Sequence, residues 1–330
     1  MSMCCMVAKA SKLGCDEFGI PGTSLWCVKA GLDNSAALHD AYCAQVSRQF
    51  KQLVVFGDSI SDDGISPEHG DVLGLKVYTN GLTWDKYLVN RRGVGRGGEK
   101  IANFAFGGAR SGIGGDNAVD FGGLQYQEPR AGGVGSQVSI YEQQLANCSR
   151  LAGPRTLHAI EIGTNDLVFY IKSGSQNRTE AAVVIETLVG NVIQAVQTLA
   201  ATGQRNFLLF SLPPLHDTPR IKALGPAVVA AVGGLVQMTN QQLRIVAEKL
   251  NRIGSGVAVA FVDVGGSKFR EAVQNHFPIQ DTPLEVDRHN LAIKPGTLHQ
   301  YAFFDDLHPS TGTHWLIARA AACSMADKFG

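Results

Sequence analysis

Short apolar runs recur along this chain, with room for a helix between one run and the next. Leu53–Phe56 is entirely apolar and is followed directly by Gly57. A run of this length and composition is typical of a strand buried on both faces of a sheet. Four further runs predict strands at Ile101–Phe106, Leu157–Ile162, Asn206–Leu212 and Val257–Val262.

Helical patterns occupy the intervals between these runs. In Ala182–Ala200 apolar residues recur with the helical period, and Gly203 marks a plausible stop. Strands that alternate with helices pair in parallel, so we expect one α/β domain whose sheet is covered on both faces. Further helices are predicted at Ser136–Ala146, Ala227–Leu250 (weakened by Gly233-Gly234) and Thr311–Asp327.

The first part of the chain differs from the rest. Residues 1–50 lack strong periodicity and hold five of the seven cysteines, so we predict an N-terminal extension, with a short helix near 36–49, and a domain over 51–330. The cysteine number is odd and no Cys-x-x-Cys pair exists, which disfavours a zinc knuckle and a complete disulfide framework. Lys9 and Lys12 interrupt the apolar start, so no clean signal peptide is visible.

The charge balance argues against nucleic-acid binding, and the hydropathy pattern argues against an integral membrane span. Lys plus Arg and Asp plus Glu each number 29, so the formal net charge is zero. A nucleic-acid-binding protein needs a concentrated basic surface, which this balance disfavours. Because no run of about 18 consecutive apolar residues occurs, we expect no integral membrane span.

Polar residues and glycines follow three of the predicted strands. Ser59 comes just after the first strand and, we expect, near a helix start whose backbone N–H groups favour negative charge. Gly107-Gly108 follows the second strand, and Asn165, a side-chain amide donor, follows the third. Each of these alone is also common as a cap or a tight turn.

A histidine near the last predicted helix completes the set. Asp305 precedes His308 by three residues, a spacing that lets the carboxylate orient the imidazole. Together, a hydroxyl, candidate oxyanion donors and an Asp–His pair form a full inventory for acyl transfer through a serine ester.

Competing motifs are poorly supported. Ser59 does not lie in Gly-x-Ser-x-Gly, which disfavours the α/β-hydrolase nucleophile elbow. Gly93-x-Gly95-x-x-Gly98 matches a dinucleotide-binding pattern but follows Arg91-Arg92 rather than a strand. Neither a phosphate-binding Gly-x-x-x-x-Gly-Lys loop nor a His-Glu-x-x-His zinc motif occurs, so we expect no cofactor and no metal.

Four ordered blocks carry a family resemblance. Gly57-Asp58-Ser59-Ile60 resembles the Gly-Asp-Ser-Leu signature of the GDSL esterases and lipases (SGNH hydrolases), with Ile in place of Leu. Asn103–Ala109, Gly163–Asp166 and Asp305–His308 are similar to the later blocks of that family. Further similarity to its phospholipase/lecithinase/haemolysin-like branch is carried by Tyr78–Trp84 and Leu212–Leu215.

The resemblance implies a fold and a set of roles. The fold would be the flavodoxin-like three-layer α/β/α sandwich of SGNH hydrolases, around a parallel five-stranded sheet. Ser59 would be the nucleophile, His308 the general base and Asp305 the residue that orients it. The oxyanion would be bound by the backbone N–H groups of Ser59 and Gly108, the latter chosen over Gly107, and by the side-chain amide of Asn165.

Three functions remain open from the sequence. The first is hydrolysis of lipid or short-chain acyl esters, in which the aromatic and aliphatic residues around Thr79–Leu88 either line an acyl groove or, equally well for many of them, pack in the core. The second is an acyltransferase that moves an acyl group from a phospholipid to a sterol or other alcohol, and the third is a non-catalytic binder. The intact set of polar residues disfavours the binder. The resemblance also favours secretion and allows transient contact with a lipid surface; the compartment and oligomeric state are not predicted.

Overall fold

The computed structural model describes only part of the 330-residue chain. The extension predicted up to residue 50, apart from Phe50 itself, and the pattern Gly93–Gly98 lie outside that part. The described residues are 50–64, 78–90, 100–113, 132–147, 153–175, 177–252, 256–284, 286–287, 292–293 and 300–330.

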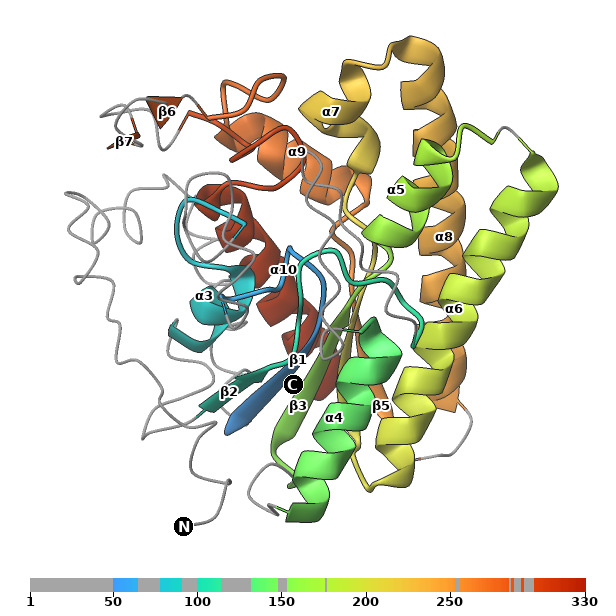
Figure 1. Ribbon diagram of the computed structural model, residues 1–330. Helices are drawn as coiled ribbons and strands as arrows, with labels where there is room; N and C mark the ends of the chain where they lie inside the picture. Colours follow the sequence, from blue (N-terminus) through green and yellow to red (C-terminus); the bar gives the residue numbers. More distant parts are fainter. Residues whose placement is uncertain are drawn as a thin grey trace.

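A parallel five-stranded sheet forms the centre of the fold, as predicted (Figure 1). The strands are β1 (Gln52–Gly57), β2 (Lys100–Asn103), β3 (Thr156–Glu161), β4 (Asn206–Phe210) and β5 (Ala258–Val262). Their order is β2-β1-β3-β4-β5, the flavodoxin-like order. From β1 the chain goes to one side for β2 and to the other for β3, so a topological switch point lies between β1 and β3.

Helices cover both faces of this sheet and make the three-layer sandwich (Figure 1). Alternate residues of β1 point to opposite faces: Val54 and Phe56 pack in one core cluster, and Leu53 and Val55 in the other. The first face is covered by α4 (Val134–Asn147), α6 (Arg178–Ala201) and α8 (Pro226–Arg252). The second is covered by α3 (Trp84–Asn90), α9 (Ser267–His276) and α10 (Thr311–Phe329).

Smaller elements lie beyond the carboxyl ends of the strands. They are α5 (Thr164–Lys172), the 3-10 turn η4 (Leu215–Asp217), α7 (Pro219–Lys222), and the antiparallel pair β6 (Val286–Asp287) and β7 (Ala292–Ile293). A third apolar cluster joins α5 and α7 to the ends of α6 and α8, and Leu307 packs against it. This cluster builds one wall of the site described below.

One helix of the described part, α6, is long and apolar enough to cross a membrane by length and composition, with a mean hydropathy of 1.4. Leu188, Val192, Val196 and Leu199 of this helix are buried in the core against the sheet. Their spacing of three and four residues is that of a helix packed on one face. We therefore describe α6 as a core helix of the sandwich.

Several predicted boundaries were wrong for local reasons. The strand predicted at Ile101–Phe106 ends at Asn103, because the Asn103 side chain accepts a hydrogen bond from the N–H of Ala105 and turns the chain. The strand predicted to reach Leu212 ends at Phe210. By contrast, the weakness expected at Gly233-Gly234 does not interrupt α8, whose neighbours Val232, Leu235 and Val236 are buried.

Candidate active site

Ser59 lies in a tight turn directly after β1. The N–H groups of Ser61 and Asp62 both donate to the Asp58 carbonyl, and the Asp58 carboxylate accepts from the N–H of Ile60 at 3.0 Å. The helix start predicted here is therefore wrong: the Asp58 side chain closes a turn, and no helix begins before Trp84 in the described residues. Ser59 is buried, with 7% of its surface exposed to solvent.

The end of β1 is held in place from the helix layer. The side-chain amide of Gln137, on α4, accepts from the Gly57 N–H at 2.9 Å and donates to the Gly57 carbonyl at 2.8 Å. A Cβ at position 57 would lie 2.6 Å from the Glu161 carbonyl oxygen, so glycine is needed where β1 turns against β3. These contacts fix the position from which the Ser59 turn departs.

Asp305 and His308 come from the loop that precedes α10. One Asp305 oxygen accepts from the N–H groups of Leu307 and His308, at 2.8 and 2.6 Å, and the other lies 2.6 Å from Nδ1 of His308. Ser310, the next polar residue, caps α10 by accepting from the Thr313 N–H. The cap and the Asp305 contacts together set the direction of the imidazole.

The structure brings His308 to Ser59. Nε2 of His308 lies 2.9 Å from Oγ of Ser59, although the two residues are 249 positions apart in the chain. The ring of Tyr78 packs on the imidazole with its centroid 5.0 Å away. A hydroxyl, an imidazole and a carboxylate thus lie in line, an arrangement that can remove a proton from the hydroxyl.

Two opposing effects act on the Asp305 carboxyl. Burial alone would raise its pKa, but the hydrogen bond and charge of His308, with the N–H groups of His308 and Leu307, outweigh burial and lower the pKa to about 2. Asp305 is therefore ionised over the range in which proteins are usually folded. Its neighbour Asp306 points elsewhere and binds Arg220.

The two glycines after β2 differ in what their N–H groups do. The Gly107 N–H donates to the Asp62 carboxylate at 2.9 Å, and a Cβ at this position would lie 2.2 Å from the Tyr78 hydroxyl oxygen. Gly108 has a φ of +79°, and among the described residues no hydrogen-bond acceptor meets its N–H or that of Ser59. Gly108 is thus the glycine with a backbone donor available to a ligand.

Asn165 lies in the first turn of α5, at the carboxyl end of β3. Its side-chain amide donates to the Ala109 carbonyl at 3.0 Å and to the Asp58 carboxylate at 3.3 Å. Gly163, just before α5, has a φ of +120°, and a Cβ there would lie 2.7 Å from Leu188 and 2.9 Å from Leu212. Only glycine satisfies both restrictions, and it places Asn165 beside the Ser59 turn.

Buried carboxyl groups lie behind the Ser59 turn. Glu161, at the end of β3, accepts from the Ser61 hydroxyl at 2.9 Å, and that hydroxyl accepts from the Trp84 indole N–H. Burial raises the Glu161 pKa to about 7. Burial, followed by the charge of Glu161, raises the pKa of Asp58 well above its ordinary range. The raised pKa values of these two carboxyl groups were not expected from the sequence, in which Asp58 appears only as part of the signature.

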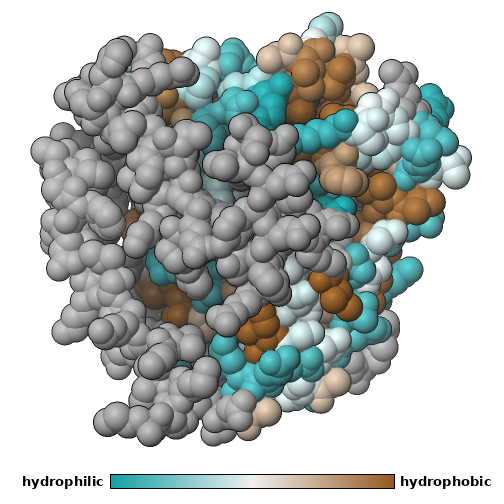
Figure 2. All heavy atoms as spheres, in the orientation of Figure 1, coloured by the Kyte–Doolittle hydropathy of each residue, from teal (hydrophilic) through white to brown (hydrophobic). Residues whose placement is uncertain are grey.

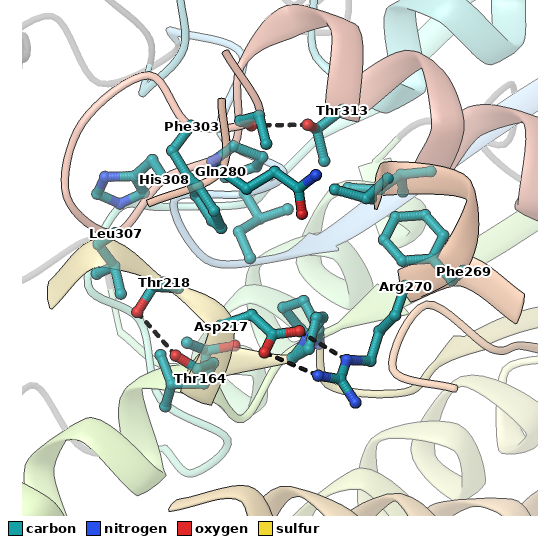
Figure 3. A pocket seen from close by; sticks show the side chains of 18 of the residues that line it. Thr164, Asp217, Thr218, Phe269, Arg270, Gln280, Phe303, Leu307, His308 and Thr313 are labelled. Carbon is teal, nitrogen blue, oxygen red and sulfur yellow. Dashed lines mark hydrogen bonds and ion pairs between the residues drawn. The ribbon is translucent and has the colours of Figure 1, made fainter. Parts of the chain in front are cut away.

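A pocket with a volume of about 100 Å³ opens beside Ser59 and His308 (Figure 3). One wall is formed by η4 and α7, with Leu215 and Thr218, and the facing wall by α9, with Phe269 and Val273. Asn165 also lines the pocket. The position of the pocket, at the carboxyl ends of the strands, is where ligands bind in open α/β sheets.

Three ion pairs join the two walls of this pocket, and we call them the cross-pocket pairs. Each has one member on η4 or α7 and the other on α9 or on a loop of the facing wall. All of them are partly exposed to solvent. They are Asp217–Arg270, Arg220–Asp306 and Lys222–Asp281, with closest N–O distances of 2.6, 2.6 and 2.5 Å.

The acyl groove expected around Thr79–Leu88 is not where the pocket lies. Thr79, Trp84 and Leu88 are buried, and Trp84 and Leu88 pack in the core against α10. The lining was not predicted from the sequence; the one signal there is the motif Leu212–Leu215, which leads into η4. Among the described residues no group of three or more His, Cys, Asp or Glu side chains is placed to hold a metal ion.

Hydrophilic and hydrophobic side chains are mixed on the described surface seen in Figure 2, and neither class dominates it.

Comparison with known proteins adds a family and relatives. A family model described as GDSL-like Lipase/Acylhydrolase matches residues 53–321. An acetylesterase from Thermothelomyces thermophilus is 24% identical over 295 residues, which cover 84% of this chain and 89% of the acetylesterase.

Solved structures of similar proteins include two esterases or lipases. A single-residue variant of Axe2, an acetyl xylan esterase from Geobacillus stearothermophilus, has a TM-score of 0.45 and 14% identity, covering 84% of this chain and 96% of that one. An extracellular lipase from Streptomyces rimosus has a TM-score of 0.41 and 14% identity, covering 82% of this chain and 99% of the lipase.

Proposed function

The chain belongs to the GDSL-like lipase/acylhydrolase family and is a carboxylic ester hydrolase, and we propose that it works through a covalent acyl ester on Ser59. The observation that carries this proposal is the position of His308, with Nε2 2.9 Å from the Ser59 hydroxyl and Nδ1 2.6 Å from Asp305. In this geometry one imidazole is oriented by the carboxylate and is within reach of the nucleophile's proton.

The first half of the reaction forms the acyl-enzyme. His308 takes the proton of the Ser59 hydroxyl as Oγ attacks the ester carbonyl carbon. Negative charge develops on the carbonyl oxygen, which we assign to the N–H groups of Ser59 and Gly108 and the side-chain amide of Asn165. Loss of one such donor typically costs about 3 kcal/mol of transition-state stabilisation. The C–O bond to the alcohol then breaks, and His308 gives its proton to the leaving oxygen.

The second half releases the acid. Water takes the place of the alcohol, His308 removes its proton, and the resulting hydroxide attacks the acyl carbon. The ester bond to Ser59 breaks and Oγ recovers the proton from His308. The Asn165 amide already donates to Ala109 and Asp58, so binding of the oxyanion would require it to shift one hydrogen bond.

The proposed substrate class rests on the similarity to the acetylesterase and not on the geometry of the site alone. The acetylesterase similarity supports esters with short acyl groups. The narrower resemblance to the phospholipase/lecithinase/haemolysin-like branch stays a prediction. We also propose that residues 51–330 form the hydrolase domain, since the family match runs from 53 to 321.

A variant at the nucleophile tests this mechanism. Wild type and Ser59→Ala are compared on p-nitrophenyl esters, with Ser139→Ala, at an exposed serine of α4, as the matched control. We expect Ser59→Ala to lose nearly all activity and Ser139→Ala to keep it. Labelling with a fluorophosphonate, followed by peptide mass spectrometry, should place the adduct on Ser59. Equal rates for wild type and Ser59→Ala would rule the mechanism out.

The same acyl-enzyme could also pass its acyl group to an alcohol, the alternative that the sequence leaves open. Incubation with a phospholipid and a sterol separates the two activities, because only a transferase yields the steryl ester. Free fatty acid as the sole acyl product would restrict the protein to hydrolysis.

A further inference from the structure

The Asp217–Arg270 pair stands where the pocket meets solvent. Both residues line the pocket, and both are partly exposed to solvent: 26% of the Asp217 side chain and 38% of the Arg270 side chain is exposed. Two hydrogen bonds join them, from Nε to Oδ2 at 2.6 Å and from Nη2 to Oδ1 at 2.9 Å. In Figure 3 this pair and His308 lie on opposite sides of the pocket.

The surface between His308 and this pair is largely apolar. Its apolar lining residues are Leu215, Phe269, Val273, Phe303 and Leu307, and Gln280 is one of the few polar side chains among them (Figure 3). Pockets of this composition bind an apolar group and use their few polar residues to fix its orientation or its limit. The group that occupies the space next to Ser59 is therefore an apolar one.

The size of the pocket restricts that group. Its volume of about 100 Å³ is smaller than the engineered protein cavity of about 150 Å³ that takes up one benzene molecule. By this comparison with benzene, which has six carbons, the pocket has room for an acyl chain of about four carbons. A longer chain would have to pass the Asp217–Arg270 pair, where it would remove water from two charges without offering them a hydrogen bond.

We propose that the Asp217–Arg270 pair sets the maximum length of the acyl group, so that this protein hydrolyses acetyl to butyryl esters and rejects octanoyl and longer ones. The inference rests on the proposed function of Ser59. The pocket is assigned to the acyl group because it opens at Ser59, which keeps that group through the second half-reaction while the alcohol has left.

The test compares two substrate series on the full-length protein. One varies the acyl chain in p-nitrophenyl esters from acetate to decanoate, and the other varies the alcohol in acetates from methyl to octyl. For wild type we expect kcat/KM to fall at least tenfold between butyrate and octanoate, and to depend far less on the alcohol. A limit seen only in the alcohol series would overturn the assignment.

The double variant Asp217→Ala/Arg270→Ala removes the boundary. We expect its octanoate-to-acetate ratio of kcat/KM to rise at least tenfold, a gain that misfolding cannot produce. Arg270→Ala alone should give a smaller rise, because it leaves the Asp217 charge facing the chain. An unchanged ratio in the double variant would overturn the inference.

A matched ion pair outside the pocket serves as the control. Arg244 on α8 binds Asp263 at 2.5 Å, also partly exposed to solvent at 50% and 41%, and neither residue lines the pocket. Arg244→Ala should keep the wild-type dependence of kcat/KM on acyl chain length. If its octanoate-to-acetate ratio rises as much as that of the double variant, the Asp217–Arg270 pair does not set the limit. If folded wild type hydrolyses no ester at all, the proposed function fails first; if it hydrolyses acetate and octanoate equally, only the length limit fails.

Discussion

Arg220 binds Asp306, the residue next to Asp305, through both carboxylate oxygens and through the backbone. Its guanidinium donates from Nε at 3.0 Å and from Nη2 at 2.6 Å, and its N–H donates to the Asp306 carbonyl at 2.8 Å. The short helix α7 thus holds the loop that carries the Asp–His pair.

Arg220→Ala should therefore lower kcat by about tenfold, since a small displacement of a reacting group is costly. The side chains are 34% and 50% exposed, so the loss in the free energy of unfolding should stay below about 1 kcal/mol. Arg220→Lys should restore little of the lost kcat, because lysine cannot donate to both carboxylate oxygens in the geometry of a guanidinium.

Steady-state kinetics measure the change in kcat, and urea unfolding measures the change in stability. Arg252→Ala, at an exposed pair on α8, is the control, and equal kinetics in the two alanine variants would contradict the positioning role.

Asp305→Asn should lower kcat by at least about 10³-fold while leaving KM nearly unchanged, because an amide does not hold the imidazole in the required tautomer. Asp306→Asn is the matched control and should retain most of the activity. Comparable losses in the two variants would mean that the acid has been assigned to the wrong residue.

The lowered pKa of Asp305 also predicts a pH dependence of stability. Because the pKa is about 2 in the folded chain and about 3.9 in an unfolded one, the folded state binds the proton less tightly. The resulting stabilisation, on the order of 2 kcal/mol, is present above about pH 4 and is lost as the pH falls toward 2. Urea unfolding of wild type and Asp305→Asn at several pH values should show their difference shrinking over that window.

Glu161 predicts the opposite slope. Burial raises its pKa to about 7, so the folded state binds this proton more tightly than the unfolded state, and stability falls as the pH rises from about 4.5 to 7. Glu161→Gln keeps an acceptor for the Ser61 hydroxyl and removes this contribution, on the order of 3 kcal/mol across the window. Part of the fall in stability with pH should remain in the variant, because burial also raises the pKa of Asp58 and those of Asp62 and Asp85, the last two to about 7 and about 6. Parallel pH profiles for wild type and variant would refute the prediction.

Gly163→Ala should destabilise the fold by more than about 2 kcal/mol, since it combines a disfavoured backbone conformation with overpacking against Leu188 and Leu212. Gly203→Ala isolates the backbone effect: its φ is +94°, but a Cβ there meets nothing within 4 Å. We expect this control to lose about 1 kcal/mol. If both variants unfold at the same urea concentration, the side-chain contacts at position 163 do not matter.

The sequence predicted the sheet well because β1, β4 and β5 contain continuous apolar runs that only a doubly covered sheet can bury. It failed where side chains redirect the backbone locally, as Asp58 does after β1 and Asn103 does after β2. Helices such as α9, with Phe269 as its one buried residue, carry too weak an apolar pattern to be recognised.

The catalytic residues of the candidate site could be predicted from the sequence, but the walls of its pocket could not. Ser59 and Asn165 stand out because each is a polar residue of defined chemistry just after a strand, and the Asp305–His308 pair stands out by its spacing just before a helix. The pocket walls do not, because Asp217 and Arg270 are 53 positions apart and their meeting depends on how η4 faces α9. The packing of Tyr78 on His308 is likewise a tertiary contact without a local pattern.

Because of the cross-pocket pairs, we expect the walls of the site to be more sensitive to ionic strength than the core of the fold. Partly exposed ion pairs weaken as ionic strength rises and the screening length shortens from about 10 Å at 0.1 M to about 3 Å at 1 M. The two apolar layers on the sheet contain no such pairs among their described core residues, and burial of apolar groups does not weaken in this way. High salt should therefore loosen the walls around the substrate while the sandwich stays folded, so catalytic rate and chain-length preference would shift with ionic strength well before the protein unfolds.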